Sequence, residues 1–295
     1  MTSSLGARLR ERVTAPGRQP LLLAGAPNAL TARVVEEAGF EAVYLSGAGI
    51  TNTYLGAPDV GLLSLPELAG HVEATRDAVG LPLVVDADTG FGNALGVQRT
   101  VRTLERAGAN AIQLEDQVSP KRCGHFAGKD VIEADEMIGK IHAAVDARAS
   151  DDLLIVARTD ARAVHGLSAA CDRAAAYLEA GADIIFVEAP GSPEELAEIT
   201  RRVPGPHVAN MVEGGLTPIL PLERLRELGF AIALYANTAM RGAVAGMRIA
   251  LRHLKDHGDT TEIGDAIISW ADRQNLVRKP LFDALDEKYA GRTTE

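Results

Sequence analysis

The chain has 295 residues, of which 46% are hydrophobic and only 4% aromatic, and it carries a formal net charge of −10. This charge argues against nucleic acid as a partner, because no dense stripe of Lys and Arg offsets it. The two cysteines predict no disulfide framework or zinc site, and no stretch is apolar enough for a signal peptide or membrane helix, so we expect a cytoplasmic protein without membrane partners.

One phrase recurs four times along the chain: an acidic residue late in a helix, a glycine, and a short apolar run that ends in polar residues. A glycine just past a helix readily turns the chain into the next strand. With further β-rich apolar runs, the phrase predicts eight strands at residues 21–26, 42–47, 83–88, 111–116, 153–160, 184–190, 208–212 and 232–237. Helices are predicted between most of them, for example at 67–79, 96–107, 134–147 and 168–180.

Eight alternating strands and helices predict a closed, parallel (β/α)₈ barrel over residues 1–258. An open, doubly wound sheet is the alternative, but no G-x-G-x-x-G between a strand and a helix supports it. Residues 259–295 lie beyond the eighth unit. We expect them to form a C-terminal helical extension that could pack on a neighbouring subunit.

Polar residues collect where the predicted strands end, which is where barrel enzymes carry their catalytic groups. These residues are Ser46, Asp86, Asp88, Glu115, Asp116, Arg158, Asp160, Glu188, Asn210, Glu213 and Asn237. Scattered surface charge would explain one or two of them. Acidic ends on the third, fourth and sixth predicted strands together favour a functional site.

The carboxylates of Asp86 and Asp88 point to the same side of their strand, and Glu115 could approach from the next strand. A set of ligands that consists of carboxylate oxygens and includes no His or Cys suits a hard cation. Mg²⁺ is favoured over Ca²⁺, because it commonly uses one or two carboxylates and fills its octahedron with waters and substrate oxygens. Asp-x-Asp alone is a weak signal, since such residues also cap loops, but their position at strand ends favours the metal.

The segment 120–129 places Cys123 among side chains that are or can be cationic, namely Lys121, Arg122 and His125. Nearby positive charge stabilises a thiolate, so this thiol could act as an acid, a base or a nucleophile. Two glycines in the segment would let it bend over a substrate and exclude water.

Three other places could bind an anion or closely approach a ligand. The planar fork of Arg158 could hold a carboxylate, with a structural salt bridge to Glu188 or Asp160 as an equal alternative. Backbone N–H groups of residues 46–49 could surround another anion, although this pattern is weak evidence. Gly214-Gly215 permits backbone approach to a ligand, or it forms a turn.

Taken together, the motifs at 43–47, 86–92, 114–117, 120–125, 157–161 and 210–215 resemble those of the isocitrate lyase and phosphoenolpyruvate mutase superfamily. The resemblance runs from Leu21 to Met247. Lys-Arg-Cys-Gly-His at 121–125 is similar to the branch of methylisocitrate and 2-alkylmalate lyases. Carboxyphosphonoenolpyruvate mutases also resemble this pattern.

The resemblance implies that Asp86 contacts Mg²⁺, with Mn²⁺ as a possible substitute, while Asp59, Asp88 and Glu115 hold its waters. It implies that Ser46, Gly47 and Ala48 bind the carboxylate of the substrate with help from Arg158, and that Glu188 and Asn210 complete the pocket. We also expect Gly214, Gly215 and Pro218 at the substrate-binding site. Lys121, Cys123 and His125 would lie on a gating loop, with Tyr44 also at the catalytic centre. It further implies a homotetramer whose C-terminal helices are exchanged in pairs.

The implied reaction begins with removal of the hydroxyl proton of a 2-hydroxy acid and cleavage of the adjacent carbon bond. Pyruvate or a related α-keto acid leaves, and Cys123 protonates the remaining carboxylate enolate as a general acid. Asp59, Tyr44 and a metal-bound hydroxide are the alternatives for the base.

Departures from the family pattern affect the expected substrate. Phe126 stands where methylisocitrate lyases commonly have Arg, and Gly214 stands where they have Phe. Together with Ala48, where glycine is common, they predict a smaller and less charged 2-alkylmalate. Pro218 replaces the serine of the family's oxaloacetate hydrolases, which disfavours hydrolysis.

Two other functions are alternatives to a lyase. One is a carboxyphosphonoenolpyruvate-type mutase, which shares much of the same pattern. The other is a ligand-binding barrel without turnover. Loss of the metal carboxylates or of Cys123 would mark the second, and the sequence retains all of them.

Overall fold

The computed structural model describes residues 3–15, 17–122, 124 and 128–290. The chain divides into two compact units, Met1–Thr238 and Ala239–Glu295. No helix in the described residues is long and apolar enough to cross a membrane. All strands of the described residues lie in the first unit, which is described first.

Eight parallel strands form one sheet in the order β6-β5-β4-β3-β2-β1-β8-β7. They are β1 (Leu21–Gly25), β2 (Val43–Leu45), β3 (Leu83–Asp86), β4 (Ala111–Glu115), β5 (Leu154–Thr159), β6 (Ile184–Val187), β7 (Val208–Asn210) and β8 (Ile232–Tyr235). A parallel bridge between Ile185 and His207 joins β6 to the residue before β7, so the sheet is nearly closed. The predicted barrel is confirmed, and the open sheet is wrong.

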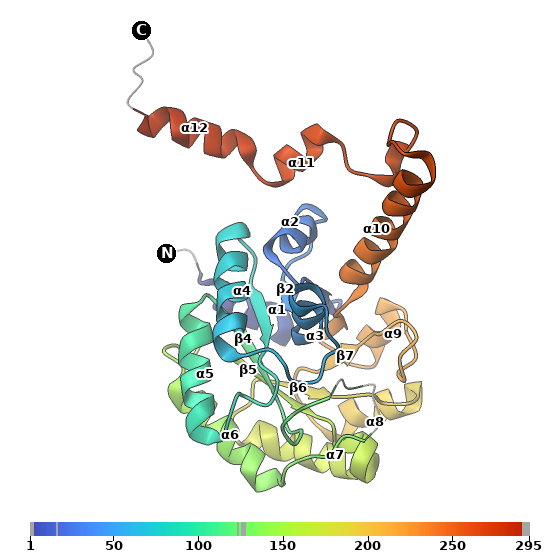
Figure 1. Ribbon diagram of the computed structural model, residues 1–295. Coiled ribbons are helices and arrows are strands. Elements are labelled where there is room, and N and C mark those ends of the chain that lie inside the picture. The colour runs from blue at the N-terminus through green and yellow to red at the C-terminus, as the bar shows by residue number, and fades with distance from the viewer. Residues whose placement is uncertain (1–2, 16, 123, 125–127, 291–295) are drawn as a thin grey trace. The chain divides into compact units, whose positions relative to one another are not determined.

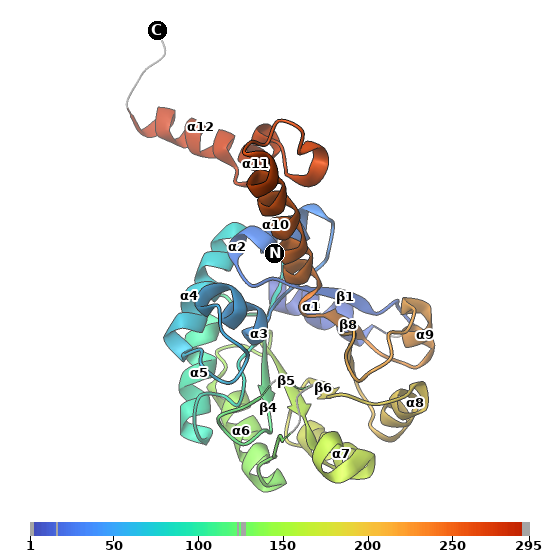
Figure 2. The same ribbon diagram turned by 45° about the vertical axis from the view of Figure 1, so that its right-hand side comes forward.

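Helices surround the strands of the first unit (Figures 1 and 2). They are α1 (Leu5–Thr14), α2 (Ala29–Glu37), α3 (Gly47–Ile50), the π-helix η1 (Thr51–Leu55), α4 (Leu65–Ala78), α5 (Ala94–Arg106), α6 (Ala134–Ala147), α7 (Ala161–Glu179), α8 (Pro193–Arg202) and α9 (Leu222–Glu227). The helix predicted at 168–180 begins earlier, because α7 continues through a kink at Gly166 with φ of 85°. Side-chain oxygens of Asn28, Asn93 and Ser192 cap α2, α5 and α8.

The recurring glycines take the predicted conformation. Positive φ angles of 83°, 107°, 104° and 85° occur at Gly39, Gly108, Gly181 and Gly229. Each lies two residues after the last residue of a helix and directs the chain into the next strand. This local rule explains why the sequence pattern located the strands.

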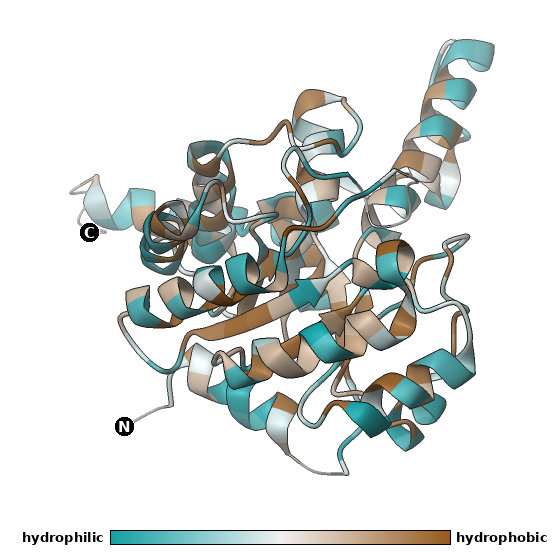
Figure 3. Cartoon of the chain, turned by 90° about the horizontal axis from the view of Figure 1, so that it is seen from below, coloured by the Kyte–Doolittle hydropathy of each residue, from teal (hydrophilic) through white to brown (hydrophobic). Residues whose placement is uncertain are grey.

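Two apolar layers follow from the alternation of side chains along the strands. Outward-facing residues such as Val85 and Ile112 pack with the helices. Inward-facing residues fill the barrel, and Leu9 and Val13 of α1 pack with them at the amino-terminal end. Figure 3 shows largely brown strands, whereas brown and teal alternate along the helices. The barrel is therefore a packed core, and an open site can form only at its ends.

The second unit is helical. It contains most of α10 (Thr238–His257), a 3₁₀ turn at Gly264–Ala266, α11 (Trp270–Leu276) and α12 (Lys279–Tyr289). None of these helices contains a buried residue. The predicted division after residue 258 falls at the end of α10, whereas the boundary between the compact units falls at its first residue.

Candidate active site

A cavity of 90 Å³ lies at the carboxyl ends of the strands. Its lining residues are Tyr44, Ser46, Ala48, Asp59, Asp86, Glu115, Lys121, Arg122, Gly124, Arg158, Phe186, Glu188, Asn210, Val212, Leu234, Ala236 and Asn237. The structure therefore brings together ten of the residues predicted for the site. Gly47, Asp88, Gly214, Gly215 and Pro218 are described but are not among the residues that line this cavity.

Asp86, the last residue of β3, is 7% exposed and is held by three donors. Its carboxylate accepts hydrogen bonds from the backbone N–H of Gly47 and of Asp88 and from Nε2 of Gln113, each at 3.3 Å. Asp88 has a φ of 48°, a conformation uncommon for a residue other than glycine. The turn after β3 is thus shaped to direct both carboxylates toward the site.

Lys121 reaches into this group of carboxylates. Its Nζ lies 2.5 Å from Oδ1 of Asp59 and 2.9 Å from Oδ1 of Asp88, and its side chain is 5% exposed. Burial alone would lower the pKa of Lys121, but Asp88 and Asp86 raise this pKa well above its ordinary value. The ammonium group therefore stays charged and partly neutralises the carboxylates.

Nearby cations do not fully compensate the negative charge of two of these carboxylates, Asp88 and Glu115. Burial, only partly offset by Lys121, raises the pKa of Asp88 to about 7. Burial also raises the pKa of Glu115 well above its ordinary value, despite the opposing effect of Arg158. Oε1 of Glu115 is buried without a hydrogen-bond partner among the described residues. Both groups would be stabilised as anions by an additional cation.

A divalent cation fits the chemistry of this donor set, which consists of Asp59, Asp86, Asp88 and Glu115 and has only oxygen ligands. In the described part of the chain, no three His, Cys, Asp or Glu side chains converge closely enough to hold a metal as they stand. Lys121 instead supplies the positive charge between Asp59 and Asp88. The predicted metal ligands are therefore gathered at one site, but they are not arranged as a completed coordination sphere.

Arg158 contacts three carboxylates at once. The guanidinium lies 2.8 Å from Asp160, 3.3 Å from Glu115 and 3.4 Å from Glu188. Burial alone would lower the pKa of Arg158, but Asp160 and Glu188 raise this pKa well above its ordinary value. Both salt bridges that the sequence offered as alternatives to substrate binding are present. Arg158 thus organises the buried carboxylates and also faces the cavity.

Tyr44 forms part of the cavity floor. Its hydroxyl donates to Oε1 of Gln113 at 3.2 Å. Burial, strengthened by the negative charge of Asp86, raises the pKa of Tyr44 well above 10.0. The phenol therefore keeps its proton near neutral pH and is a poor candidate for the base. Sequence reasoning missed Gln113, although a single amide within the apolar run at 111–114 was a usable signal.

The described residues of the segment 121–129 are held against the barrel. Side-chain atoms of Gln117 bond both the N–H and the carbonyl of Arg122 at 2.9 Å. Lys129 donates to the carbonyl of Gly124 and, at 2.6 Å, to Asp160. A Cβ on Gly124 would lie 2.5 Å from Nη2 of Arg158, so only glycine fits there.

Three residues that entered the predictions, Cys123, His125 and Phe126, lie outside the described residues. Their predicted roles therefore stay predictions. The contacts of Lys121, Arg122 and Gly124 locate only the neighbouring parts of the same segment.

Four further predicted residues have hydrogen bonds or backbone angles that locate them. Oγ of Ser46 caps α3 by accepting from the N–H of Gly49 at 3.1 Å, and Nδ2 of Asn210 donates to Glu188 at 3.2 Å. Gly214 has a φ of 77°, and the N–H of Gly215 donates to the carbonyl of Val212 at 2.9 Å. The Gly-Gly pair therefore forms the turn that the sequence allowed as the alternative to ligand contact.

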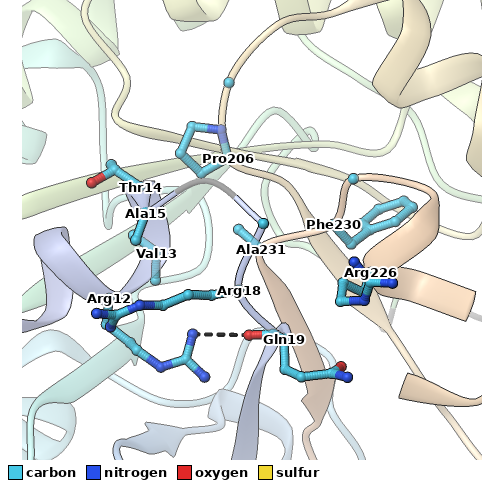
Figure 4. A pocket seen from close by; sticks show the side chains of 13 residues that line it. Arg12, Val13, Thr14, Ala15, Arg18, Gln19, Pro206, Arg226, Phe230 and Ala231 are labelled. Carbon is cyan, nitrogen blue, oxygen red and sulfur yellow. Dashed lines mark hydrogen bonds between the residues drawn. The ribbon is translucent and has the colours of Figure 1, made fainter. Parts of the chain in front are cut away.

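A second cavity, of 290 Å³, lies at the amino-terminal end of the barrel and contains three arginines in its lining (Figure 4). Arg12 donates to both carboxylate oxygens of Glu41 and to the carbonyl of Gln19. Arg12 and Arg226 lie in the last turns of α1 and α9. Helix C-termini favour positive charge, so these two arginines have a structural explanation.

Comparisons with known proteins agree with this geometry. The sequence profile described as phosphoenolpyruvate phosphomutase matches residues 10–255. The chain is 43% identical to 2,3-dimethylmalate lyase of Eubacterium barkeri, covering 96% of this chain and 98% of that protein. It is 44% identical to 2-methylisocitrate lyase of Aeropyrum pernix, covering 98% and 92%. It is 41% identical to the chloroplastic carboxyvinyl-carboxyphosphonate phosphorylmutase of Arabidopsis thaliana, covering 92% and 81%.

Solved structures give the same result. A crystal structure of 2,3-dimethylmalate lyase matches with a TM-score of 0.91 and 33% identity over 99% of this chain and 97% of that one. Phosphonopyruvate hydrolase in complex with oxalate and Mg²⁺ matches with a TM-score of 0.87 and 31% identity over 98% and 100%. The predicted enzyme class agrees with relatives named as lyases. This chain belongs to the phosphoenolpyruvate mutase and isocitrate lyase superfamily.

Proposed function

We propose that this chain is a cytoplasmic, Mg²⁺-dependent lyase that cleaves a 2-alkylmalate, or a related 2-hydroxy dicarboxylate, into an α-keto acid and a carboxylate. The observation that carries the proposal is the group of buried carboxylates at the carboxyl ends of the strands, which has too little positive charge of its own. Burial of several carboxylates lowers the stability of the fold unless a cation compensates their charge, so their presence supports a bound metal ion.

Asp86 is our candidate for direct contact with Mg²⁺ or Mn²⁺, with Asp59, Asp88 and Glu115 binding its waters. When bound, the ion would supply the positive charge that orients and polarises the substrate's hydroxyl and carboxylate oxygens. The related hydrolase whose structure contains Mg²⁺ and oxalate supports this choice of metal. Lys121 would remain beside the carboxylates and stabilise negative charge that develops on the substrate.

The chemical steps belong to side chains around the cavity. We propose that a carboxylate of the site takes the hydroxyl proton. Tyr44 is not proposed for this step, because burial and the charge of Asp86 raise the pKa of Tyr44 and keep its phenol protonated. The electrons of the broken carbon bond then pass to the departing carboxylate enolate. We propose that Cys123 gives its thiol proton to the enolate carbon, with Lys121 and His125 stabilising the enolate charge. Ser46, Gly47 and Ala48 would bind the keto acid carboxylate.

The lining of the cavity supports a dicarboxylate over a tricarboxylate. Phe186, Val212, Leu234 and Ala236 give it an apolar wall that could receive alkyl groups. The cations Lys121 and Arg158 already contact carboxylates of the protein. An additional substrate carboxylate would find little uncompensated positive charge there. The cavity therefore favours 2,3-dimethylmalate, named for the Eubacterium barkeri relative, over 2-methylisocitrate, named for the Aeropyrum pernix relative.

A substrate panel tests the proposal. Release of α-keto acid would be followed from 2-alkylmalates, 2-methylisocitrate and oxaloacetate, with and without Mg²⁺. We expect the highest kcat/KM for a 2-alkylmalate and a loss of about a thousandfold or more without the metal. Preference for 2-methylisocitrate would overturn the substrate assignment, and metal-independent cleavage would overturn the assignment of the carboxylates.

A phosphonomutase is the second candidate, because the Arabidopsis thaliana relative carries that name. Adding a carboxyphosphonoenolpyruvate-type substrate to the same panel separates the two. Formation of a new carbon–phosphorus bond, followed by ³¹P NMR, without cleavage of any malate would replace the lyase with the mutase. Tight binding of several panel compounds without any reaction would instead indicate a binding protein.

We also propose a homotetramer with exchanged C-terminal helices. The helices of the second unit contain no buried residue. Large hydrophobic side chains are exposed there, including Leu251, Ile268, Trp270 and Phe282. Exposed apolar surface of this kind marks an interface. Light scattering coupled to size-exclusion chromatography should give four times the chain mass of 31.1 kDa, and a monomer would overturn the proposal.

A further inference from the structure

The inward-facing residues just below the site are mainly apolar. They include Leu23, Val84, Val156, Phe186 and Leu234, all of which belong to the cluster inside the barrel. Tyr44 and Gln113 depart from this pattern, with exposures of 3% and 1%. An amide buried in apolar surroundings is unfavourable unless its polar atoms are bonded. The amide of Gln113 therefore needs an explanation beyond the packing of the core.

Both the oxygen and the nitrogen of that amide form hydrogen bonds. Oε1 of Gln113 accepts from the Tyr44 hydroxyl at 3.2 Å, and Nε2 donates to Oδ1 of Asp86 at 3.3 Å. Gln113 pairs with Asp86 across β3 and β4, so the strand register itself brings the two side chains together. The amide thus links the cavity floor to the candidate metal-binding carboxylate.

The direction of the amide is fixed by its neighbours. The Tyr44 phenol keeps its proton and donates, so the oxygen of Gln113 must face it. The NH₂ group is then left to face Asp86, which can only accept when ionised. The N–H groups of Gly47 and Asp88 add two further donors to the same carboxylate. Three donors from different elements together set the orientation of Asp86.

We infer that Gln113 is a positioning residue that orients the carboxylate of Asp86 for cation binding. The inference rests on the proposed function, because it assumes that the carboxylate group binds a metal. Hydrogen bonds from outside the coordination sphere orient metal ligands, and their removal typically weakens metal binding by roughly 10- to 100-fold. Gln113 would act through Asp86 without touching the substrate.

The test measures Mn²⁺ and Mg²⁺ binding to the full chain by calorimetry, without substrate. Gln113→Leu removes the donor to Asp86, and we expect the Kd for the metal to rise by roughly 10- to 100-fold. Tyr44→Phe is the matched control, since it removes the other hydrogen bond of the amide but leaves the donor to Asp86. Its Kd should rise less than that of Gln113→Leu, because the donor to Asp86 is retained. Gln113→Met, which keeps the length of the side chain, replaces Gln113→Leu if the latter does not fold.

The outcomes separate the two proposals. If the wild type binds the metal and a folded Gln113 variant binds it with the same Kd, the role of Gln113 is overturned, but the proposed function is not. Equal weakening by the Gln113 variant and by Tyr44→Phe, in proportion to lost stability in urea, would reduce Gln113 to a structural residue and also overturn it. Absence of metal binding in the wild type would overturn the metal-dependent function, and this inference with it.

Discussion

The two ends of the barrel both collect charged side chains, but in different surroundings. At the carboxyl end, Lys121 and Arg158 are 5% and 8% exposed and lie among buried carboxylates. At the amino end, Arg12 pairs with Glu41, whose side chain is 58% exposed. Solvent weakens the second kind of interaction far more than the first. Burial, rather than the number of charges, therefore distinguishes the end that carries the candidate site from the end that does not.

Removal of the metal should have the largest effect on the carboxyl end. Treatment with EDTA is expected to lower kcat/KM by about a thousandfold or more, because several kcal/mol of charge stabilisation depend on the ion. Added Mg²⁺ should restore the activity of the EDTA-treated wild-type protein but not that of the Asp86→Asn variant. The Glu41→Gln variant, changed at the amino end, is the control, and the Mg²⁺ concentration that restores its activity should equal that of the wild type. Full turnover by wild-type protein that mass spectrometry shows to be metal-free would contradict a metal-dependent site at the carboxyl end.

Replacing the thiol proposed as the acid should have the next largest effect. Cys123→Ser is expected to lower kcat by about 100- to 10,000-fold, the range typical of a lost general acid. Cys171→Ala is the matched control, because Cys171 is 1% exposed in the core between strands and helices. Steady-state release of keto acid measures both. Equal turnover in Cys123→Ser and wild type would remove Cys123 from the mechanism.

Crowding of the carboxyl end should have a smaller effect. In Gly124→Ala the new methyl group would lie 2.5 Å from Nη2 of Arg158 and 2.7 Å from Cδ of Glu188. Displacement of these groups should lower kcat/KM by roughly 100-fold. Gly139→Ala on α6 is the control, since nothing lies within 4 Å of its Cβ position. If both variants have wild-type kinetics, the segment around Gly124 does not need this close contact for turnover.

The pH dependence of stability tests whether the buried carboxylates lack a cation. Burial, partly offset by Lys121, raises the pKa of Asp88 from 3.8 to about 7 in the folded chain. The folded state then holds a proton that the unfolded state has lost, so the free energy of unfolding should fall as pH rises from about 4 to about 7. Urea unfolding without metal measures this slope. Saturating Mg²⁺ or Asp88→Asn should flatten it, and an unchanged slope in Asp88→Asn would rule out this assignment.

Much of the barrel was predictable because its rules are local. A glycine with positive φ, such as Gly108, ends a helix and starts the next strand within a few residues. The ends of parallel strands lie together in any such barrel, so Asp86, Glu115 and Glu188 could be grouped from sequence alone.

The finer structure of the site depends on distances between strands and therefore escaped prediction. Lys121 was expected on a loop, but its position between Asp59 and Asp88 follows from how that loop packs. Gln113 looked like part of an apolar strand until the register placed it opposite Asp86. Likewise, Arg158 had two possible carboxylate partners in the sequence, and the fold gives it both of them and Glu115.

The smallest effect is expected at the amino end. Arg12→Ala removes hydrogen bonds to Glu41 and to the carbonyl of Gln19, and it should lower the free energy of unfolding by about 1 kcal/mol or less. Added salt should reduce this difference, because Glu41 is exposed. The kcat/KM and the Kd for Mg²⁺ should stay unchanged, since the arginine lies at the opposite end of the barrel from the carboxylates. A change in either constant at equal stability would show that the two ends are coupled, and the separation drawn between them would then fail.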